Sequence, residues 1–198
     1  MKPMLKALAI ATAMVASGAV SASTFVFQAT LDGPSEAPPN ASPGTGFTTV
    51  TIDDVAKTMR VEANFSGLLG NTTASHIHCC TAVPGVSTAG VATVTPTFTD
   101  FPSGVKSGSY DHTFDLTLTT GTFNTSFVTA NGGTAASATA ALAAGLNAGK
   151  AYFNIHTSTF GGGEIRGFLA PAPVPVPAAV WLLGSALGGL IARRRVAA

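Results

Sequence analysis

Charged side chains are scarce in this chain, and basic ones are scarcest in its centre. Lys, Arg, Asp and Glu together make up 10% of the 198 residues. Between residues 23 and 169, five Lys and Arg face nine Asp and Glu, a net charge of minus four. A sparsely charged, mildly acidic domain has no basic stripe to neutralise phosphates. We therefore expect no nucleic-acid partner.

Motifs of the common catalytic centres are also missing. The sequence has no serine nucleophile elbow, no zincin helix motif and no carboxylate pair at a spacing that indicates a catalytic dyad. The glycine run at residues 161–163 lacks the Lys-Ser or Lys-Thr of a phosphate-binding loop. We predict that the protein is not an enzyme.

Charge is absent from an apolar run near the start of the chain. Lys2 and Lys6 precede the run at residues 7–20, and small residues follow it at Val20-Ser21-Ala22. This order is typical of a secretory signal peptide that signal peptidase removes. We expect residues 1–22 to be a signal helix that is cleaved on export.

A second uncharged run lies near the other end. A proline-rich linker at residues 170–179 leads into the apolar segment Val180–Ala192. Three arginines follow it: Arg193, Arg194 and Arg195. The thirteen apolar residues fall short of the roughly 20 that a bilayer span needs, but the arginines would stay on the cytoplasmic side. We expect residues 180–198 to form a marginal membrane helix, with a buried helix of the central domain as the alternative.

The sequence of this tail, VPVPAAVWLLGSALGGLIARRR, resembles the PEP-CTERM class of bacterial sorting signals, most closely its VPLPA variant. Val176 and Pro177 stand in the core motif, where Val176 replaces the Leu of that variant. The resemblance implies processing by a membrane-embedded exosortase, often alongside exopolysaccharide production. It predicts a protein held transiently at the inner membrane by its C-terminus and then delivered to the cell surface or the extracellular space.

The residues between the two ends have the composition of short strands joined by turns. Thr occurs 26 times from Ser23 to Leu169, with abundant Val and Phe and frequent Gly, Pro and Asn. The predicted strands are 25–31, 47–52, 58–65, 75–78, 91–95, 113–119, 151–157 and 164–169. One Ala-rich helix is predicted at Thr134–Leu146. We expect an all-β domain, a single Greek-key β-sandwich of the immunoglobulin or copper-zinc superoxide dismutase kind.

Histidines two residues apart stand out in one of the predicted strands. His76 and His78 point to the same face there, because side chains alternate along a strand. His156 shares a face of another strand with Tyr152 and Asn154, and the two histidine faces could meet. Two hypotheses stay open. The three imidazoles hold one copper or zinc ion, or they make hydrogen bonds that fix strand ends and loops without any metal.

The only two cysteines, Cys79 and Cys80, follow the histidines directly. Three hypotheses compete: a vicinal disulfide that stiffens the turn after the strand, a thiolate pair that joins the histidines around the ion, or pairing with another chain. Export into an oxidising compartment favours the vicinal disulfide.

Glu164 and Arg166 follow a glycine turn near the end of the domain. Glu164 could be a catalytic acid, but a lone carboxylate has no partner with which to run acid and base steps. We expect it to pair with polar backbone at the turn, while Arg166 braces a neighbouring strand.

Several of these segments together compose a recognisable pattern. It consists of Gly33, Glu36, Pro38 and Pro39, then ASHIH at 74–78, YFNIHT at 152–157 and GGEIRG at 162–167. The pattern resembles the CHRD domain, first described in chordin, over about residues 24–169. That resemblance implies no catalytic activity, and bacterial members are largely uncharacterised exported proteins.

The chain departs from this family at two places. Cys79 and Cys80 stand where Gly-Pro usually follows the HIH motif, and Gly161 stands where a Pro commonly precedes Gly-Gly-Glu. The first departure leaves the conformation of that loop open, and the second loosens a turn.

Two functions follow from these observations. The first is a non-enzymatic cell-surface or matrix module that binds exopolysaccharide, a cell-surface protein or a metal ion. The alternative is a mononuclear copper or zinc protein or metalloenzyme of superoxide-dismutase-like layout. A two-metal site needs about six or more His plus a carboxylate. This chain has four His, at 76, 78, 112 and 156, so we expect it to hold at most one metal ion.

Overall fold

The computed structural model describes residues 24–173 of the chain. The predicted signal peptide (1–22), the end of the proline-rich linker (174–179) and the predicted membrane helix (180–198) lie outside the described residues. The same holds for the predicted sorting residues Val176, Pro177, Arg193, Arg194 and Arg195. Within residues 24–173, no helix is long and apolar enough to span a bilayer.

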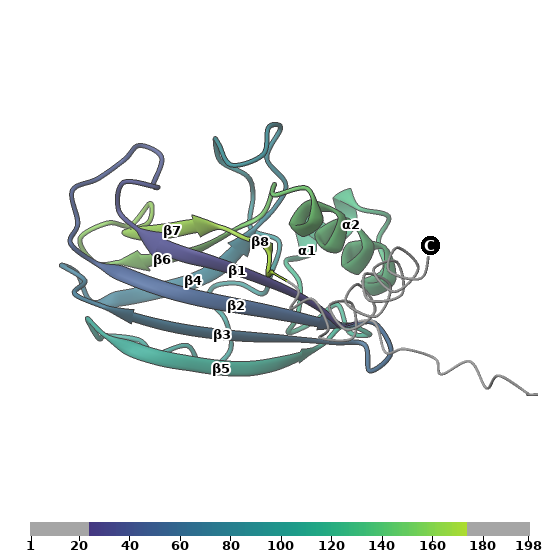
Figure 1. Cartoon of the computed structure of the whole chain (residues 1–198). Helices are drawn as coiled ribbons and strands as arrows, with labels where there is room; N and C mark the ends of the chain where they lie inside the picture. Colours follow the sequence, from purple (N-terminus) through teal and green to yellow (C-terminus); the bar gives the residue numbers. More distant parts are fainter. Residues whose placement is uncertain (1–23, 174–198) are drawn as a thin grey trace, which may run out of the picture.

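Eight strands and two helices make up the described part of the chain (Figure 1). In order they are β1 (Thr24–Asp32), β2 (Thr45–Asp53), β3 (Thr58–Ser66), β4 (Thr72–His78), β5 (Gly108–Asp115), α1 (Thr125–Ala130), α2 (Ala135–Asn147), β6 (Tyr152–Thr157), β7 (Ile165–Phe168) and β8 (Ala170–Pro171).

β2 and β3 form a hairpin. Their register runs without a break from Thr45 opposite Ser66 to Asp53 opposite Thr58. The Asp53 carboxylate closes the turn by accepting hydrogen bonds from the backbone N–H groups of Val55 and Ala56. Alternate residues of β3 are buried, because side chains alternate between the two faces of a strand: Met59, Val61, Ala63 and Phe65.

All the strands belong to one antiparallel sheet in the order β4-β6-β7-β1-β2-β3-β5, with β8 paired to β1. β1 joins the two halves, because Asp32 pairs with Arg166 of β7 while Phe27 and Gln28 pair with Pro171 and Ala170 of β8. The sheet curls around the core. The Phe98 ring lies 5.8 Å from that of Phe153 on β6 and 5.4 Å from that of Phe114 on β5.

The prediction of a mostly β domain is therefore confirmed. The strands are hydrogen-bonded to one another as one curled sheet. The pairing of β1 with β7 and β8 makes this connection, which the alternation of apolar residues within single strands could not reveal.

The helices lie together at one end of the curled sheet (Figure 1). The predicted helix is α2, which Thr134 caps through a capping box with Ser137. Its buried residues Leu142 and Leu146 join the core. The shorter α1, capped by Asn124, was not predicted.

Two strand predictions are corrected. Residues 91–95 form no strand: Val91 and Thr93 make isolated bridges while the segment crosses the end of β4, and the Ala92 N–H bonds to the Ile77 carbonyl. The strand predicted at 113–119 is β5, which begins earlier and ends at Asp115. The Asp115 carboxylate accepts from the Thr117 N–H and turns the chain.

Candidate metal centre

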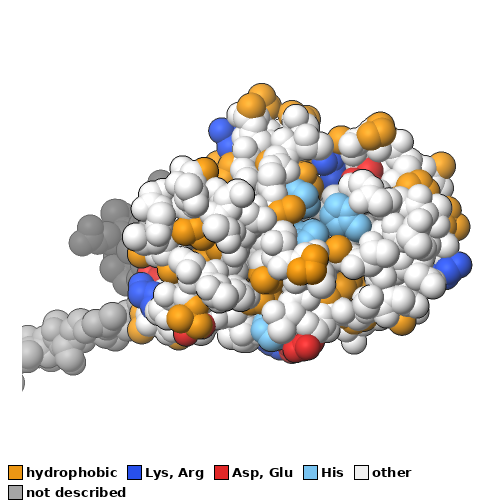
Figure 2. Space-filling view, turned by 180° about the vertical axis from the view of Figure 1, so that it is seen from behind, with side chains coloured by type: hydrophobic (Ala, Val, Ile, Leu, Met, Phe, Trp, Pro, Cys, Tyr) orange, Lys and Arg blue, Asp and Glu red, His pale blue; other side chains and the backbone are white. Residues whose placement is uncertain are grey.

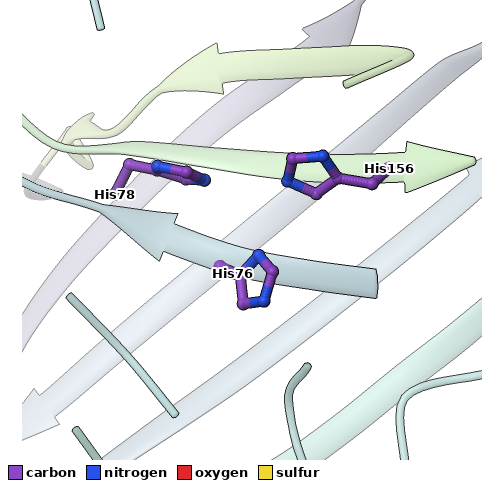
Figure 3. A group of neighbouring side chains, drawn as sticks. All are labelled: His76, His78 and His156. Atoms are coloured by element: carbon purple, nitrogen blue, oxygen red, sulfur yellow. The ribbon is translucent and has the colours of Figure 1, made fainter. Parts of the chain in front are cut away.

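Histidine side chains gather near the middle of one face of the molecule, with basic and acidic side chains beside them (Figure 2). His76 and His78 come from β4 and His156 comes from the neighbouring strand β6. In the register, Ala74 lies opposite His156, and His76 lies opposite Asn154. All three histidines therefore project from the same face of the sheet, as Figure 3 shows.

The structure brings together the three histidines that the sequence singled out. Their ring centroids lie 5.3 Å apart for His76 and His156, 5.8 Å for His76 and His78, and 5.9 Å for His78 and His156. One nitrogen from each ring lies within 4.8 Å of the others. Ile77, between the two β4 histidines, is fully buried in the core on the opposite face, as strand alternation predicts.

Each imidazole is fixed by one hydrogen bond to a backbone carbonyl. His76 Nε2 lies 2.6 Å from the oxygen of Pro96, His78 Nδ1 lies 2.9 Å from that of Ala89, and His156 Nδ1 lies 3.0 Å from that of Gly161. Because a carbonyl oxygen only accepts, the ring nitrogen facing it carries the proton.

The second nitrogen of each ring therefore presents a lone pair. These atoms are His76 Nδ1, His78 Nε2 and His156 Nε2, all buried and without a hydrogen-bond partner among residues 24–173. Metal-binding histidines typically have this arrangement, in which a carbonyl holds one nitrogen and the other is free to coordinate.

The surroundings keep these rings neutral. Burial lowers the pKa of all three histidines, although the carbonyl hydrogen bonds oppose this effect. Charge repulsion from the neighbouring imidazoles lowers the pKa of His76 and His78 further, and Arg166 adds to the repulsion at His78. The pKa of His78 falls to about 4. Near pH 7 the imidazoles therefore have unprotonated nitrogens, which is the form that binds metal ions.

The Tyr152 ring packs against His78, and Arg166 packs against Tyr152 in turn. The His78 ring stacks on that of Tyr152, with centroids 4.7 Å apart and planes 5° from parallel. The guanidinium of Arg166 lies 4.7 Å from the centre of the Tyr152 ring. Arg166 also donates hydrogen bonds to the carbonyls of Ser35 and Ser87. It thus contacts the neighbouring strand β6 through Tyr152, and it also braces two loops.

Two further polar side chains at the site were not predicted as site residues. Glu36 and Asn154 are 5% and 3% exposed, and Glu36 Oε1 and Asn154 Oδ1 have no hydrogen-bond partner within the described part of the chain. Burial raises the pKa of Glu36 to about 7 despite the opposing charge of Arg166, whose Nε lies 3.8 Å from Glu36 Oε2. Asn154 shares the face of His156, as the sequence showed, but no local signal placed Glu36 beside it.

The residues present fit a transition-metal ion. Neutral imidazole suits zinc and copper, and three protein nitrogens with one further position form a familiar type of open metal site. Bonds from these metals to imidazole nitrogen are about 2.0–2.1 Å long, so the rings would move closer together around the ion. A bound ion would act there as a Lewis acid.

The cysteines lie elsewhere. Cys79 and Cys80 are bonded to each other as a vicinal disulfide, and their sulfur atoms pack against Gly145 of α2. Neither belongs to the group of side chains that converge at the histidines. The structure therefore does not place a thiolate pair beside the imidazoles.

His112 and Glu164 also lie apart from the three histidines. His112 is on β5, where its ring contacts Phe114. Glu164 is fully buried and accepts hydrogen bonds from the side chains of Ser42 and Thr157 and from the backbone of Leu69 and Gly70. Glu164 therefore pairs with polar backbone as expected, but the N–H groups belong to Leu69 and Gly70 and not to its own glycine turn.

Comparison with known proteins identifies one family. The profile of the CHRD domain matches residues 27–169, a segment that contains all three histidines together with Glu36, Asn154 and Glu164. No curated protein and no solved structure matches the chain. With most of its length matched, the chain belongs to the CHRD domain family.

Proposed function

We propose that this protein is an exported, non-enzymatic module that binds one copper or zinc ion at His76, His78 and His156. The CHRD domain is typical of extracellular or secreted proteins. The metal assignment deepens that general role and selects one of the ligands open from the sequence, the others being a polymer or a surface protein.

One observation carries the assignment. Three buried imidazoles each use one nitrogen on a backbone carbonyl, and their other nitrogens have no partner among residues 24–173. The rings also converge, with one nitrogen of each within 4.8 Å of the others. Histidines that served only to fix loops would not need to aim their remaining lone pairs at one another, since unpartnered buried acceptors cost free energy. An ion shared by the three nitrogens removes that cost.

The delivery route is a part of the proposal that rests on the sequence. Its support is the signal-like order of residues 1–22 and the resemblance of residues 174–198 to a PEP-CTERM sorting signal. Signal peptidase and an exosortase would then be the processing partners, with transient attachment to the inner membrane before release to the surface. Exopolysaccharide or a cell-surface protein remains the proposed macromolecular neighbour.

Elemental analysis of the purified protein tests the metal assignment. We expect about one copper or zinc ion per chain, and loss of that ion in His78→Ala. His112→Ala, which removes the histidine on β5, is the matched control and should keep the ion. A folded protein that takes up neither copper nor zinc when these ions are supplied would contradict the proposal.

A further inference from the structure

We infer that an ion at the three histidines carries one exchangeable water molecule, and that Glu36 and Asn154 hold this water. The inference rests on the proposed function. It assigns to the ion one coordination position that no protein atom fills. Water occupies that position, and a small anion can replace the water.

The first argument comes from the hydrogen-bonding groups that lack partners. Across residues 24–173, five buried side-chain atoms have none: His76 Nδ1, His78 Nε2, His156 Nε2, Glu36 Oε1 and Asn154 Oδ1. The three imidazole nitrogens have lone pairs that suit a metal ion. The remaining two atoms are oxygens, and a water molecule on the ion has two O–H groups to donate. One ion with one water therefore satisfies all five atoms.

The second argument comes from the position of these oxygens. Asn154 lies opposite His76 of β4 on one side and opposite Arg166 of β7 on the other. It is also two residues from His156, so its side chain projects from the same face. The amide thus lies beside the histidines and not in a separate part of the fold.

Gly163 shows that Glu36 reaches the same place. A Cβ added to Gly163 would lie 2.6 Å from Asn154 Oδ1 and 2.6 Å from Glu36 Oε1. The two oxygens therefore approach one small space, which a side chain at position 163 would fill. Gly163 also has a φ of 131°, a conformation that favours glycine.

The third argument concerns the kind of contact that Glu36 makes. Its carboxylate does not belong to the group of atoms that lie within 4.8 Å of one another at the histidines. Direct coordination is therefore not the contact that this geometry favours, and we assign to Glu36 a contact through the water molecule on the ion. The Arg166 guanidinium, 3.8 Å from the other carboxylate oxygen, holds Glu36 in that orientation.

Copper(II) is a suitable probe because its electron paramagnetic resonance spectrum reports both its nitrogen ligands and bound water. We load the purified protein with copper(II) at pH 8 and compare spectra in ordinary and oxygen-17-enriched water. We expect three nitrogen ligands and line broadening from one bound water. Azide should displace that water and shift the spectrum.

Variants then test the two oxygens. Glu36→Gln removes a negative charge beside the water, so azide should bind about tenfold more tightly or better. Asn154→Asp adds a negative charge there, so azide should bind correspondingly more weakly. Glu62→Gln, on the exposed side of β3, should leave the azide affinity unchanged, and circular dichroism establishes that each variant is folded.

The possible failures are distinguishable. Loss of copper binding at the histidines would overturn the proposed function, and this inference with it. Copper bound by three nitrogens with neither oxygen-17 broadening nor an azide response would overturn the open position alone. An azide affinity that is the same in wild type, Glu62→Gln and whichever of the two oxygen variants folds would overturn the assignment of Glu36 and Asn154.

Discussion

Glu164 shows how a buried carboxylate can support a fold without taking part in chemistry. Burial by itself raises its pKa, yet hydrogen bonds from Ser42, Thr157 and the backbone of Leu69 and Gly70 bring the pKa below its usual value. The donors come from three separate parts of the chain. Its ionised form therefore ties these segments together.

Replacing this carboxylate should cost stability. In Glu164→Gln, one accepting oxygen becomes an amide group that faces donors, so we expect the free energy of unfolding to fall by about 2–4 kcal/mol. Because the pKa is lower in the folded state, the difference should shrink as pH falls below about 4.5. Urea denaturation measures it. Glu62→Gln, at an exposed ion pair with Arg60, should change stability by less than about 0.5 kcal/mol.

Glu36 has the opposite dependence on pH. Its pKa is about 7 in the folded protein against a usual value of 4.5, so the stability it contributes is present below pH 4.5 and is lost as pH rises through 7. Glu36→Gln does not titrate. In metal-free protein, the variant should therefore gain up to about 3 kcal/mol over wild type between pH 4.5 and pH 7.5.

Denaturation of both proteins across this pH range, with chelator present, gives the comparison. The buried histidines lower the free energy of unfolding as pH falls, because their pKa values are lower in the folded protein than in the unfolded chain. That effect is common to both proteins and cancels in the difference. Parallel stability curves for wild type and Glu36→Gln would show that Glu36 is not buried as described.

At the scale of elements, α2 shows a local preference overruled by a contact. Its Ala-rich sequence predicts the helix, and by helix propensity alone Gly145 would only weaken the last turn. The structure shows why a glycine occupies position 145. Gly145 packs directly against the sulfur atoms of Cys79 and Cys80 at the end of β4, where a side chain has no room.

Gly145→Ala separates these two effects. Helix propensity alone predicts stabilisation by about 1 kcal/mol. We instead expect destabilisation by about 1–3 kcal/mol, because the new methyl group meets the disulfide and α2 must shift away from β4. Thermal unfolding measures the change. Ala144→Gly, at the exposed neighbouring position, supplies the propensity effect alone, and an increase in stability for Gly145→Ala would contradict the packing argument.

Across the whole molecule, the site depends on pairings between distant segments. Strand alternation is enough to predict that His76 and His78 share a face, because it needs only neighbouring residues. The approach of His156 requires the register of β4 against β6. The approach of Glu36 requires the loop after β1 to pass over the sheet beside Gly163. No local pattern contains either fact, so the histidines could be named in advance while Glu36 could not.

The distinction between local patterns and long-range pairings also separates what the sequence determined about this protein from what the tertiary structure decided. Composition and alternation by themselves determined a mostly β, weakly acidic domain with a helix before its last strands, since these properties depend on residues close together in the chain. Only the tertiary structure decided that the sheet curls as one, that the cysteines face α2, and that three imidazoles converge. Those features arise from long-range strand register and from loops that cross the sheet, and burial and hydrogen bonding across the whole fold select both.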